Sequence, residues 1–191
     1  DFARIYLSNS QGMRLIIKLF EGGYLLDERI VELKQNLNSA LIPGDTADWF
    51  GYSKYEFTVQ DIDYCVVVPK IRATGSPWIW RAEFFDHEPQ ADLALLEKGW
   101  HVVYIPSAAG LYGSPEAVKM WNKAYEYLTQ QQNLSPKPVL EGFSRGGLLV
   151  YNWAASNPEK VTCIYGDAPV CVIQSWPGGK GKGQFSLEDW Q

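Results

Sequence analysis

The chain has 191 residues, a net charge of −5 and 46% apolar residues, which suits one ordinary globular domain. This composition excludes a disordered chain, a collagen and a coiled coil, and no apolar run reaches the roughly 18–20 residues that span a bilayer. The negative net charge offers no basic field for nucleic acid, so we expect neither a nucleic-acid partner nor a membrane partner.

The first 45 residues are expected to form an appended structural element without chemistry. Apolar runs at Ala3–Leu7 and Met13–Phe20 flank the turn-rich cluster 8–12, a pattern that predicts a hairpin. Between Leu25 and Leu37 the apolar residues recur near helical spacing. Residues 1–45 are therefore predicted to contain a hairpin and a helix.

Residues 46–191 form the predicted main domain, in which strand-like and helix-like segments follow one another. Two β-rich runs come first, and the short polar turn between them predicts an antiparallel pair. The predicted strands cover 55–59, 64–68, 77–85, 100–105, 138–141 and 161–165, and the predicted helices cover 90–98, 114–132 and 145–156. This order predicts an α/β fold: a mostly parallel sheet with helices on both faces and an antiparallel hairpin at its N-terminal edge.

The pentapeptide Gly142–Gly146 has the form G-x-S-x-G and is the motif that carries chemistry. It directly follows a predicted strand and opens a predicted helix, which is the strand–turn–helix setting of a nucleophile elbow. Small residues beside the serine let the chain reverse sharply and lift the hydroxyl above the sheet. We therefore predict that Ser144 is a nucleophile; in the alternative interpretation the serine only caps the helix.

On these residues the sequence resembles the α/β-hydrolase superfamily over residues 49–190, because the edge hairpin, strands, helices and elbow follow the family's order. Within it, Tyr151–Pro169 and the glycine-rich run 177–183 are similar to prolyl-oligopeptidase-like and acetyl-esterase-like bacterial hydrolases of poorly defined substrate. The resemblance implies a serine esterase that cleaves a small carboxylic ester, with a carbohydrate ester as one candidate, through an acyl-serine intermediate.

The resemblance also implies an oxyanion hole. The backbone N–H of Arg145 would be one donor. The second donor comes from the loop after the predicted strand at 77–85, where Arg81-Ala82 replaces the usual His-Gly, so Glu83 or Phe84 is expected to supply it. A serine followed by arginine at the elbow is also similar to glucuronoyl esterases, in which that arginine helps to bind the oxyanion.

The rest of a catalytic triad is not evident. A serine needs a base and an orienting acid, and the family order is serine, acid, histidine. Asp167 is a candidate acid and Asp189 a second one, whereas both histidines precede Ser144. His101 lies inside a predicted strand and is expected to be a packed structural residue, while His87 lies in a loop on the active-site side and is expected to line the substrate site.

Three explanations account for the missing base. In the first, which we expect, the sequence is a fragment, and the acid and the histidine lie beyond Gln191. In the second, the chain is an inactive hydrolase-like domain that binds a ligand or acts as a scaffold. In the third, a partner chain supplies the histidine. The oligomeric state is not predicted, and an exported bacterial protein whose signal lies outside this sequence is one expectation for its location.

The tryptophans divide into core and loop positions. Trp78, Trp80 and Trp153 are expected to pack in the core, because they lie on predicted strands or helices. Trp176 lies in a loop beside a proline and is a candidate for contact with the substrate, since flat aromatic rings suit sugar faces.

Charged residues near the predicted site have two interpretations each. Arg81 is expected to pair with a glutamate, Glu83 or Glu141, or to line the substrate site by pairing with a substrate carboxylate. Lys180 and Lys182 belong either to a flexible loop or to a basic rim that attracts an acidic substrate.

The chain has three cysteines, a small and odd number that does not suit a disulfide framework. They are expected to be small buried side chains, with a Cys163–Cys171 bridge as the alternative for an exported protein. No spacing of His, Cys and Asp fits a metal site, so we predict neither a metal ion nor a cofactor.

Overall fold

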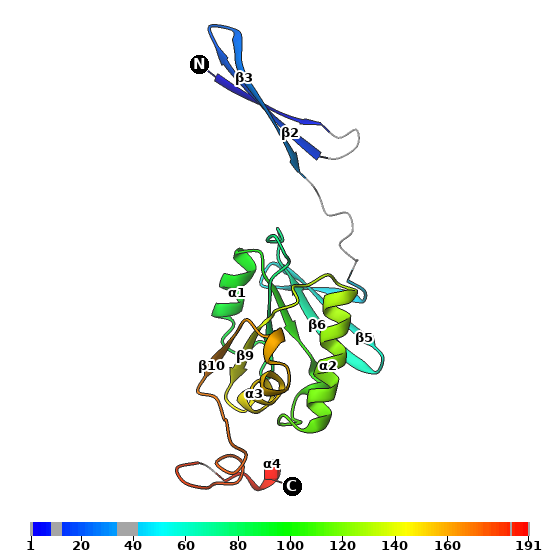
Figure 1. Ribbon diagram of the computed structural model, residues 1–191, viewed down its shortest axis with the longest axis vertical. Helices are drawn as coiled ribbons and strands as arrows, with labels where there is room; N and C mark the ends of the chain where they lie inside the picture. Colours follow the sequence, from blue (N-terminus) through cyan, green and yellow to red (C-terminus); the bar gives the residue numbers. More distant parts are fainter. Residues whose placement is uncertain (1, 9–12, 34–41, 184, 191) are drawn as a thin grey trace. The chain divides into compact units, whose positions relative to one another are not determined.

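The computed structural model describes residues 2–8, 13–33, 42–183 and 185–190. Its contacts divide the chain into two compact units, Asp1–Ser39 and Ala40–Gln191, which we describe separately. Figure 1 labels the main elements of both units. The larger unit contains the predicted elbow.

The smaller unit contains a three-stranded antiparallel sheet in the order β1-β2-β3. Its strands are β1 (Phe2–Ser8), β2 (Met13–Glu21) and β3 (Tyr24–Leu33). The antiparallel pairing of β1 with β2 confirms the predicted hairpin, although its turn at 9–12 lies outside the described residues.

The predicted helix from Leu25 is wrong over its described part, where the chain forms β3. Gly22 and Gly23 have positive φ angles of 54° and 86°, and they form a tight turn that returns the chain along β2. Pairing with β2 satisfies the backbone N–H and C=O groups on the side of this segment that faces β2. The apolar spacing favoured a helix, but a glycine turn and an adjacent partner strand decide for a strand.

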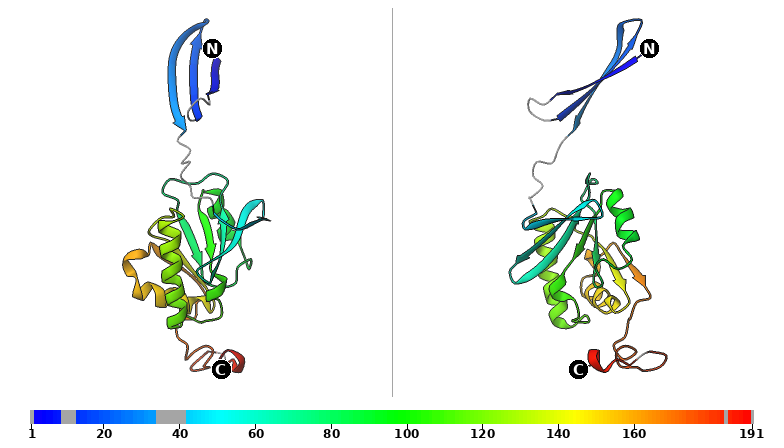
Figure 2. Two further views of the ribbon diagram at one scale, coloured as in Figure 1. Left: turned by 90° about the vertical axis from the view of Figure 1, so that its right-hand side faces the viewer. Right: turned by 180° about the vertical axis from the view of Figure 1, so that it is seen from behind.

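The larger unit is built on a seven-stranded sheet in the order β10-β9-β7-β8-β6-β5-β4. Its strands are β4 (Asp45–Trp49), β5 (Tyr52–Val59), β6 (Ile62–Val68), β7 (Trp78–Arg81), β8 (His101–Tyr104), β9 (Val139–Phe143) and β10 (Cys163–Asp167). Strands β7 to β10 run parallel, and β4 to β6 add an antiparallel section at one edge, drawn in cyan to blue-green in Figure 2. The predicted mixed sheet is confirmed, but β4 is an additional strand that the sequence did not predict.

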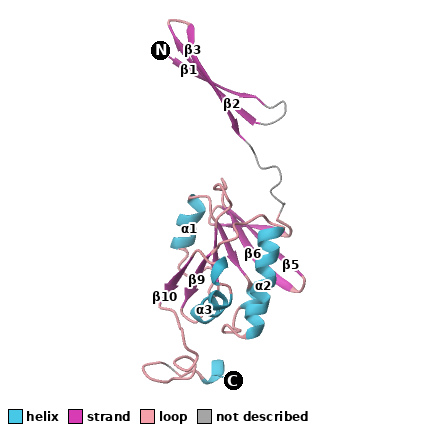
Figure 3. Cartoon of the chain, viewed as in Figure 1, coloured by secondary structure: helices cyan, strands magenta, loops and turns pink. Residues whose placement is uncertain are grey.

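Helices cover both faces of this sheet, as predicted (Figure 3). They are α1 (Gln90–Glu97), α2 (Pro115–Gln130) and α3 (Gly146–Ser156), whereas the short α4 (Leu187–Trp190) lies near the C-terminus, away from the sheet. Successive side chains of a strand point to opposite faces. Accordingly, Trp78 and Trp80 of β7 pack with residues of α2 and α3, whereas Ile79 packs with Leu96 of α1.

The core between the sheet, α2 and α3 contains four fully buried tryptophans, Trp78, Trp80, Trp121 and Trp153. The rings of Trp80 and Trp121 are stacked, with centroids 3.9 Å apart and planes 11° apart. The ring of Trp153 meets both of them edge-on. The predicted core positions are therefore confirmed, and this layer supports α3 from its buried side.

Candidate active site

Ser144 lies between β9 and α3, so the predicted strand–turn–helix arrangement is confirmed. Its φ angle is 49°, in the left-handed region, which costs a residue with a Cβ atom about 1–2 kcal/mol. Such strain persists only where the surrounding structure enforces it, and it is common at active sites. The residue is partly exposed.

Three glycines around Ser144 allow this close turn. A Cβ atom on Gly142 would lie 2.6 Å from Val150 Cγ2, and one on Gly147 would lie 2.5 Å from the carbonyl oxygen of Val170. A Cβ atom on Gly146 would lie 3.3 Å from the Cβ atoms of two residues in the loop after β7. Gly142 and Gly147 are thus required by close packing of the elbow against its surroundings, whereas a side chain at Gly146 would meet tight but milder contacts.

Asp167, the candidate acid, ends β10 beside the elbow. Its carbonyl oxygen accepts a hydrogen bond of 2.9 Å from the N–H of Ser144, and the N–H of Val170 donates back to the carbonyl oxygen of Ser144 at 2.8 Å. Asp167 is exposed, and no histidine hydrogen-bonds its carboxylate within the described residues. The structure therefore places Asp167 at the correct edge of the sheet, and its role as acid stays a prediction.

The loop after β7 lies against the elbow, where the second oxyanion donor was predicted. The N–H of Ala82 is hydrogen-bonded to the carbonyl oxygen of Glu141 and is not available. In the described part of the chain, the N–H groups of Glu83, Phe84 and Arg145 have no hydrogen-bond acceptor. These three groups thus have unused donors, and their role as oxyanion donors stays a prediction.

The Arg145 side chain joins several segments next to Ser144. Its Nε lies 3.3 Å from a carboxylate oxygen of the buried Glu83, and its Nη1 lies 3.7 Å from Asp189. Its guanidinium carbon lies 4.9 Å from the ring centroid of Phe84 and 5.5 Å from that of Tyr112. No local sequence pattern pointed to Tyr112, because its contacts are with residues far away along the chain.

The two histidines have different positions. The His87 ring is exposed and lies 5.2 Å from the ring of Phe143, the residue before Ser144, and its role in lining the substrate site stays a prediction. His101 is fully buried at the start of β8, with its Nδ1 3.3 Å from the carbonyl oxygen of Pro77. Burial lowers the pKa of His101 to about 4, which confirms a packed structural residue.

Arg81 does not line the substrate site, which corrects that part of the prediction. Its side chain is only 2% exposed, and its guanidinium pairs with Asp92 of α1 and, at 3.5 Å, with Glu141 of β9. Its Nη2 also donates to the carbonyl oxygen of His87 at 2.5 Å. A buried guanidinium requires such partners, so Arg81 is held inside the protein and anchors the loop after β7. The predicted pairing with Glu141 is confirmed.

This buried cluster contains one cation and two carboxyl groups, Asp92 and Glu141, of which the sequence did not mark Asp92 as a partner. Burial and the nearby Asp92 raise the pKa of Glu141 to about 7, and burial raises the pKa of Asp92 as well. Because two carboxylates face one guanidinium, the cluster favours retention of a proton. The available signal was Arg81 itself, a charged residue in an apolar run.

Trp176 lies near the elbow but does not touch Ser144. Its half-buried ring meets the ring of Tyr112 edge-on, with centroids 5.4 Å apart, and Tyr112 in turn packs against Arg145. Its contact with substrate stays a prediction, as does the basic rim formed by Lys180 and Lys182.

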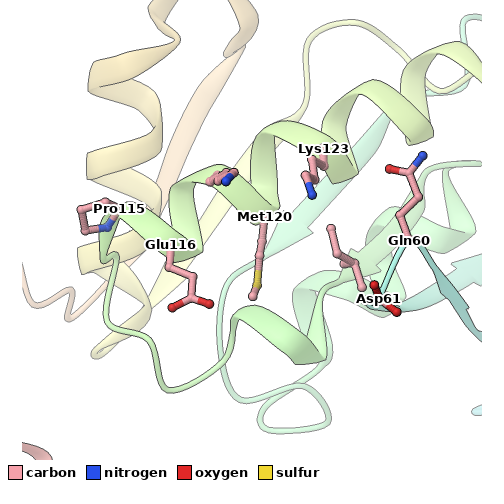
Figure 4. Close-up of a pocket in the computed structure, with 8 residues that line it drawn as sticks. Gln60, Asp61, Pro115, Glu116, Met120 and Lys123 are labelled. Atoms are coloured by element: carbon pink, nitrogen blue, oxygen red, sulfur yellow. The ribbon is translucent and has the colours of Figure 1, made fainter.

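A pocket of about 470 Å³ lies elsewhere, between the β5–β6 turn and the first half of α2 (Figure 4). Its lining includes Gln60, Asp61, Pro115, Glu116, Met120 and Lys123. No residue that the sequence marked as a candidate site residue lines it. This pocket is therefore distinct from the elbow.

The three cysteines are free; Cys65 is buried, and Cys163 and Cys171 are exposed. The expectation of buried thiols is wrong for the last two, which lie on the outer strand β10 and in the chain that follows it.

Among the described residues, no group of three or more His, Cys, Asp or Glu side chains is placed to hold a metal ion. None of the described helices combines the length and the apolar character needed to cross a bilayer.

Comparisons with models of protein families and with curated protein sequences find no match. Among solved structures, Est1E from Butyrivibrio proteoclasticus matches 71% of this chain with a TM-score of 0.51 and 16% identity. The Pyrococcus furiosus esterase Pf2001 matches 78% with a TM-score of 0.48 and 17% identity. A cold-adapted esterase from an Arctic intertidal metagenomic library matches 65% with a TM-score of 0.47 and 12% identity.

The matched regions cover 59%, 65% and 64% of those three chains, so this chain spans less than two thirds of their length. At such low identity the likeness concerns the fold, and the Est1E comparison carries it. It agrees with the mixed sheet, the helices on both faces and the strand–turn–helix at Ser144. The larger unit therefore has the α/β-hydrolase fold, as the sequence resemblance implied.

Proposed function

We propose that the larger unit is the nucleophile-bearing part of a serine hydrolase that cleaves a carboxylic ester. The observation that carries this proposal is Ser144 itself, held at a φ angle of 49° between β9 and α3, where a Cβ atom on Gly142 or Gly147 would clash with its surroundings. A left-handed backbone conformation at the serine is typical of a nucleophile elbow, whereas helix capping does not require it. The esterases among the similar structures support the same reaction class.

In the proposed reaction the Ser144 hydroxyl attacks the ester carbonyl carbon while a base takes its proton. The carbonyl oxygen becomes an oxyanion, which accepts hydrogen bonds from the N–H of Arg145 and from that of Glu83 or Phe84. The alcohol then leaves with the proton from the base, and an acyl-serine remains. Water attacks this ester, releases the acid and restores the serine.

The base is the open part of this proposal. Neither His87 nor His101 forms a hydrogen bond with Ser144 in the described structure, and His101 is buried at the start of β8. We therefore assign the base to a histidine of another segment or of a partner chain, with Asp167 as the orienting acid. The exposed His87 and the half-buried Trp176 are proposed to contact the substrate, for which a carbohydrate ester is one candidate.

Labelling of the full protein with a fluorophosphonate tests the nucleophile, because this reagent forms a stable adduct with an activated serine. We expect mass spectrometry to find one adduct on Ser144, loss of the adduct in Ser144→Ala, and retention in Ser53→Ala, which changes an exposed serine of β5. A folded protein without an adduct on Ser144 contradicts the proposed hydrolase.

The alternative is a hydrolase-like binding domain without catalysis. The observation that favours it is the lack of a histidine hydrogen-bonded to Ser144 among the described residues. It predicts a folded full protein that the fluorophosphonate does not label, so the same experiment distinguishes the two functions.

A further inference from the structure

The guanidinium of Arg145 is fixed in place by a buried carboxylate. Its Nε lies 3.3 Å from Glu83 Oε2, and the other oxygen of Glu83 accepts the N–H of Gly110 at 2.6 Å. Glu83 is only 4% exposed and is therefore held from two sides. This anchoring orients the arginine fork beside Ser144 and leaves the Nη groups as donors for another partner.

Two aromatic rings line the same guanidinium. Phe84 and Tyr112 lie with their ring centroids 4.9 Å and 5.5 Å from its central carbon. Contacts of this kind favour the cation and remove part of its surface from water. The Arg145 side chain nevertheless stays 29% exposed, so its remaining donors are accessible from solvent.

Asp189 is a close carboxylate neighbour of the Arg145 Nη groups, but it does not form a short hydrogen bond with them. Its Oδ1 is 3.7 Å from Arg145 Nη1, a long separation for an ion pair. Its oxygens are hydrogen-bonded by the hydroxyl groups of Tyr112 and Ser186 instead. Because both charged side chains are partly exposed, at 29% and 22%, this pair contributes little to stability and exchanges readily with another anion.

We infer that Arg145 is a specificity-determining residue that binds a free carboxylate of the ester substrate. This inference rests on the proposed function, since it places an anion site next to the nucleophile and selects esters that also carry a carboxylate. Asp189 occupies the position of that carboxylate in the present structure. The chain has a net charge of −5, so a local, pre-oriented cation is needed to hold an anionic substrate.

The test measures binding without turnover, in the Ser144→Ala variant of the full protein. Monomethyl glutarate and methyl valerate are matched esters of nearly equal size, and the first carries a carboxylate where the second ends in a methyl group. We expect NMR titration to give about tenfold tighter binding of monomethyl glutarate, the ratio expected of one charge-assisted hydrogen bond. Equal affinities for the two esters overturn the inference.

Variants locate the carboxylate. Arg145→Met is expected to remove the preference, Arg145→Lys to keep part of it because a lysine lacks the fork, and Asp189→Asn to increase it severalfold by removing the competing anion. Lys160→Met is the matched control, since Lys160 Nζ also lies over an aromatic ring, 4.9 Å from the centroid of Tyr125. A preference that survives in a folded Arg145→Met or Arg145→Lys protein at full strength contradicts a role for Arg145.

The outcome is separable from the proposed function. A fluorophosphonate adduct on Ser144 combined with equal affinities for the two esters supports the hydrolase and overturns the anion site. A preference for monomethyl glutarate that depends on Arg145, without an adduct on Ser144, supports the anion site and contradicts the hydrolase.

Discussion

The backbone N–H of Ser144 donates a hydrogen bond of 2.9 Å to the carbonyl oxygen of Asp167, the last residue of β10. The N–H of Val170 completes the link by donating to the carbonyl oxygen of Ser144 at 2.8 Å. The strained turn is thus fastened to the chain that follows the neighbouring strand. The geometry of the Ser144 turn depends on how closely α3 approaches the segment around Val170. Substitutions at the adjacent glycines Gly146 and Gly147 test this packing.

Gly147→Ala is expected to destabilise the protein by about 1–3 kcal/mol, because the new Cβ would lie 2.5 Å from a backbone oxygen of Val170. Gly146→Ala is the matched control, since it makes the same chemical change in the same turn of α3, with its nearest contacts at 3.3 Å. Urea denaturation of both variants measures the difference. A larger loss for Gly146→Ala contradicts the packing described at the elbow.

Ser144→Gly is expected to be about 1 kcal/mol more stable than Ser144→Ala, because the residue has a φ angle of 49° and only glycine adopts this conformation without strain. Both variants lack the hydroxyl, so the comparison isolates the backbone strain. Thermal unfolding of the two proteins checks this prediction, and equal stability shows that the turn is relaxed.

Glu141 is expected to make the folded state less stable as the pH rises. The pKa of this buried carboxyl is raised from 4.5 to about 7, so its contribution is fully present below pH 4.5 and is lost as the pH rises through about 7. The unfolding free energy of the wild type minus that of Glu141→Gln should therefore decrease over this interval. A difference that increases with pH contradicts the raised pKa.

His101 is expected to have the opposite effect. Its pKa is lowered from 6.5 to about 4, so its contribution is present above pH 6.5 and is lost as the pH falls through about 4. The unfolding free energy of the wild type minus that of His101→Asn should increase between these pH values. The two contributions partly cancel in the wild type, so the variants have to be measured separately by denaturation across the pH range.

Trp78→Phe is expected to cost about 1 kcal/mol more than Trp80→Phe, although both residues are fully buried in β7. The indole N–H of Trp78 donates to the carbonyl oxygen of Ser135 at 2.8 Å, whereas that of Trp80 has no acceptor in the described structure. Trp78→Phe leaves the carbonyl oxygen of Ser135 without its donor, whereas Trp80→Phe removes an indole N–H that has no acceptor. Urea denaturation compares the two, and the reverse order of stabilities refutes this account.

Local sequence signals were sufficient where a few neighbouring residues carry the information. Apolar periodicity and turn residues located α1, α2, α3 and the parallel strands. The hydroxyl of Ser114 accepts the N–H of Ala117 within the first turn of α2, so this helix start depends only on neighbouring residues. β3 and β4 were missed, because their stability comes from pairing with β2 and β5 rather than from their own sequence.

The sequence by itself determined the elbow, because a small residue on each side of Ser144 is a steric requirement that those few positions satisfy. Only the tertiary structure decided the partners. The tertiary structure buries Arg81 with Asp92 and Glu141. It also brings Asp189 close to Arg145, although the two residues are 44 positions apart in the chain. Contacts of this kind follow from strand order and packing, so the charge of a residue and some candidate partners are visible in the sequence, but which groups compensate it is not.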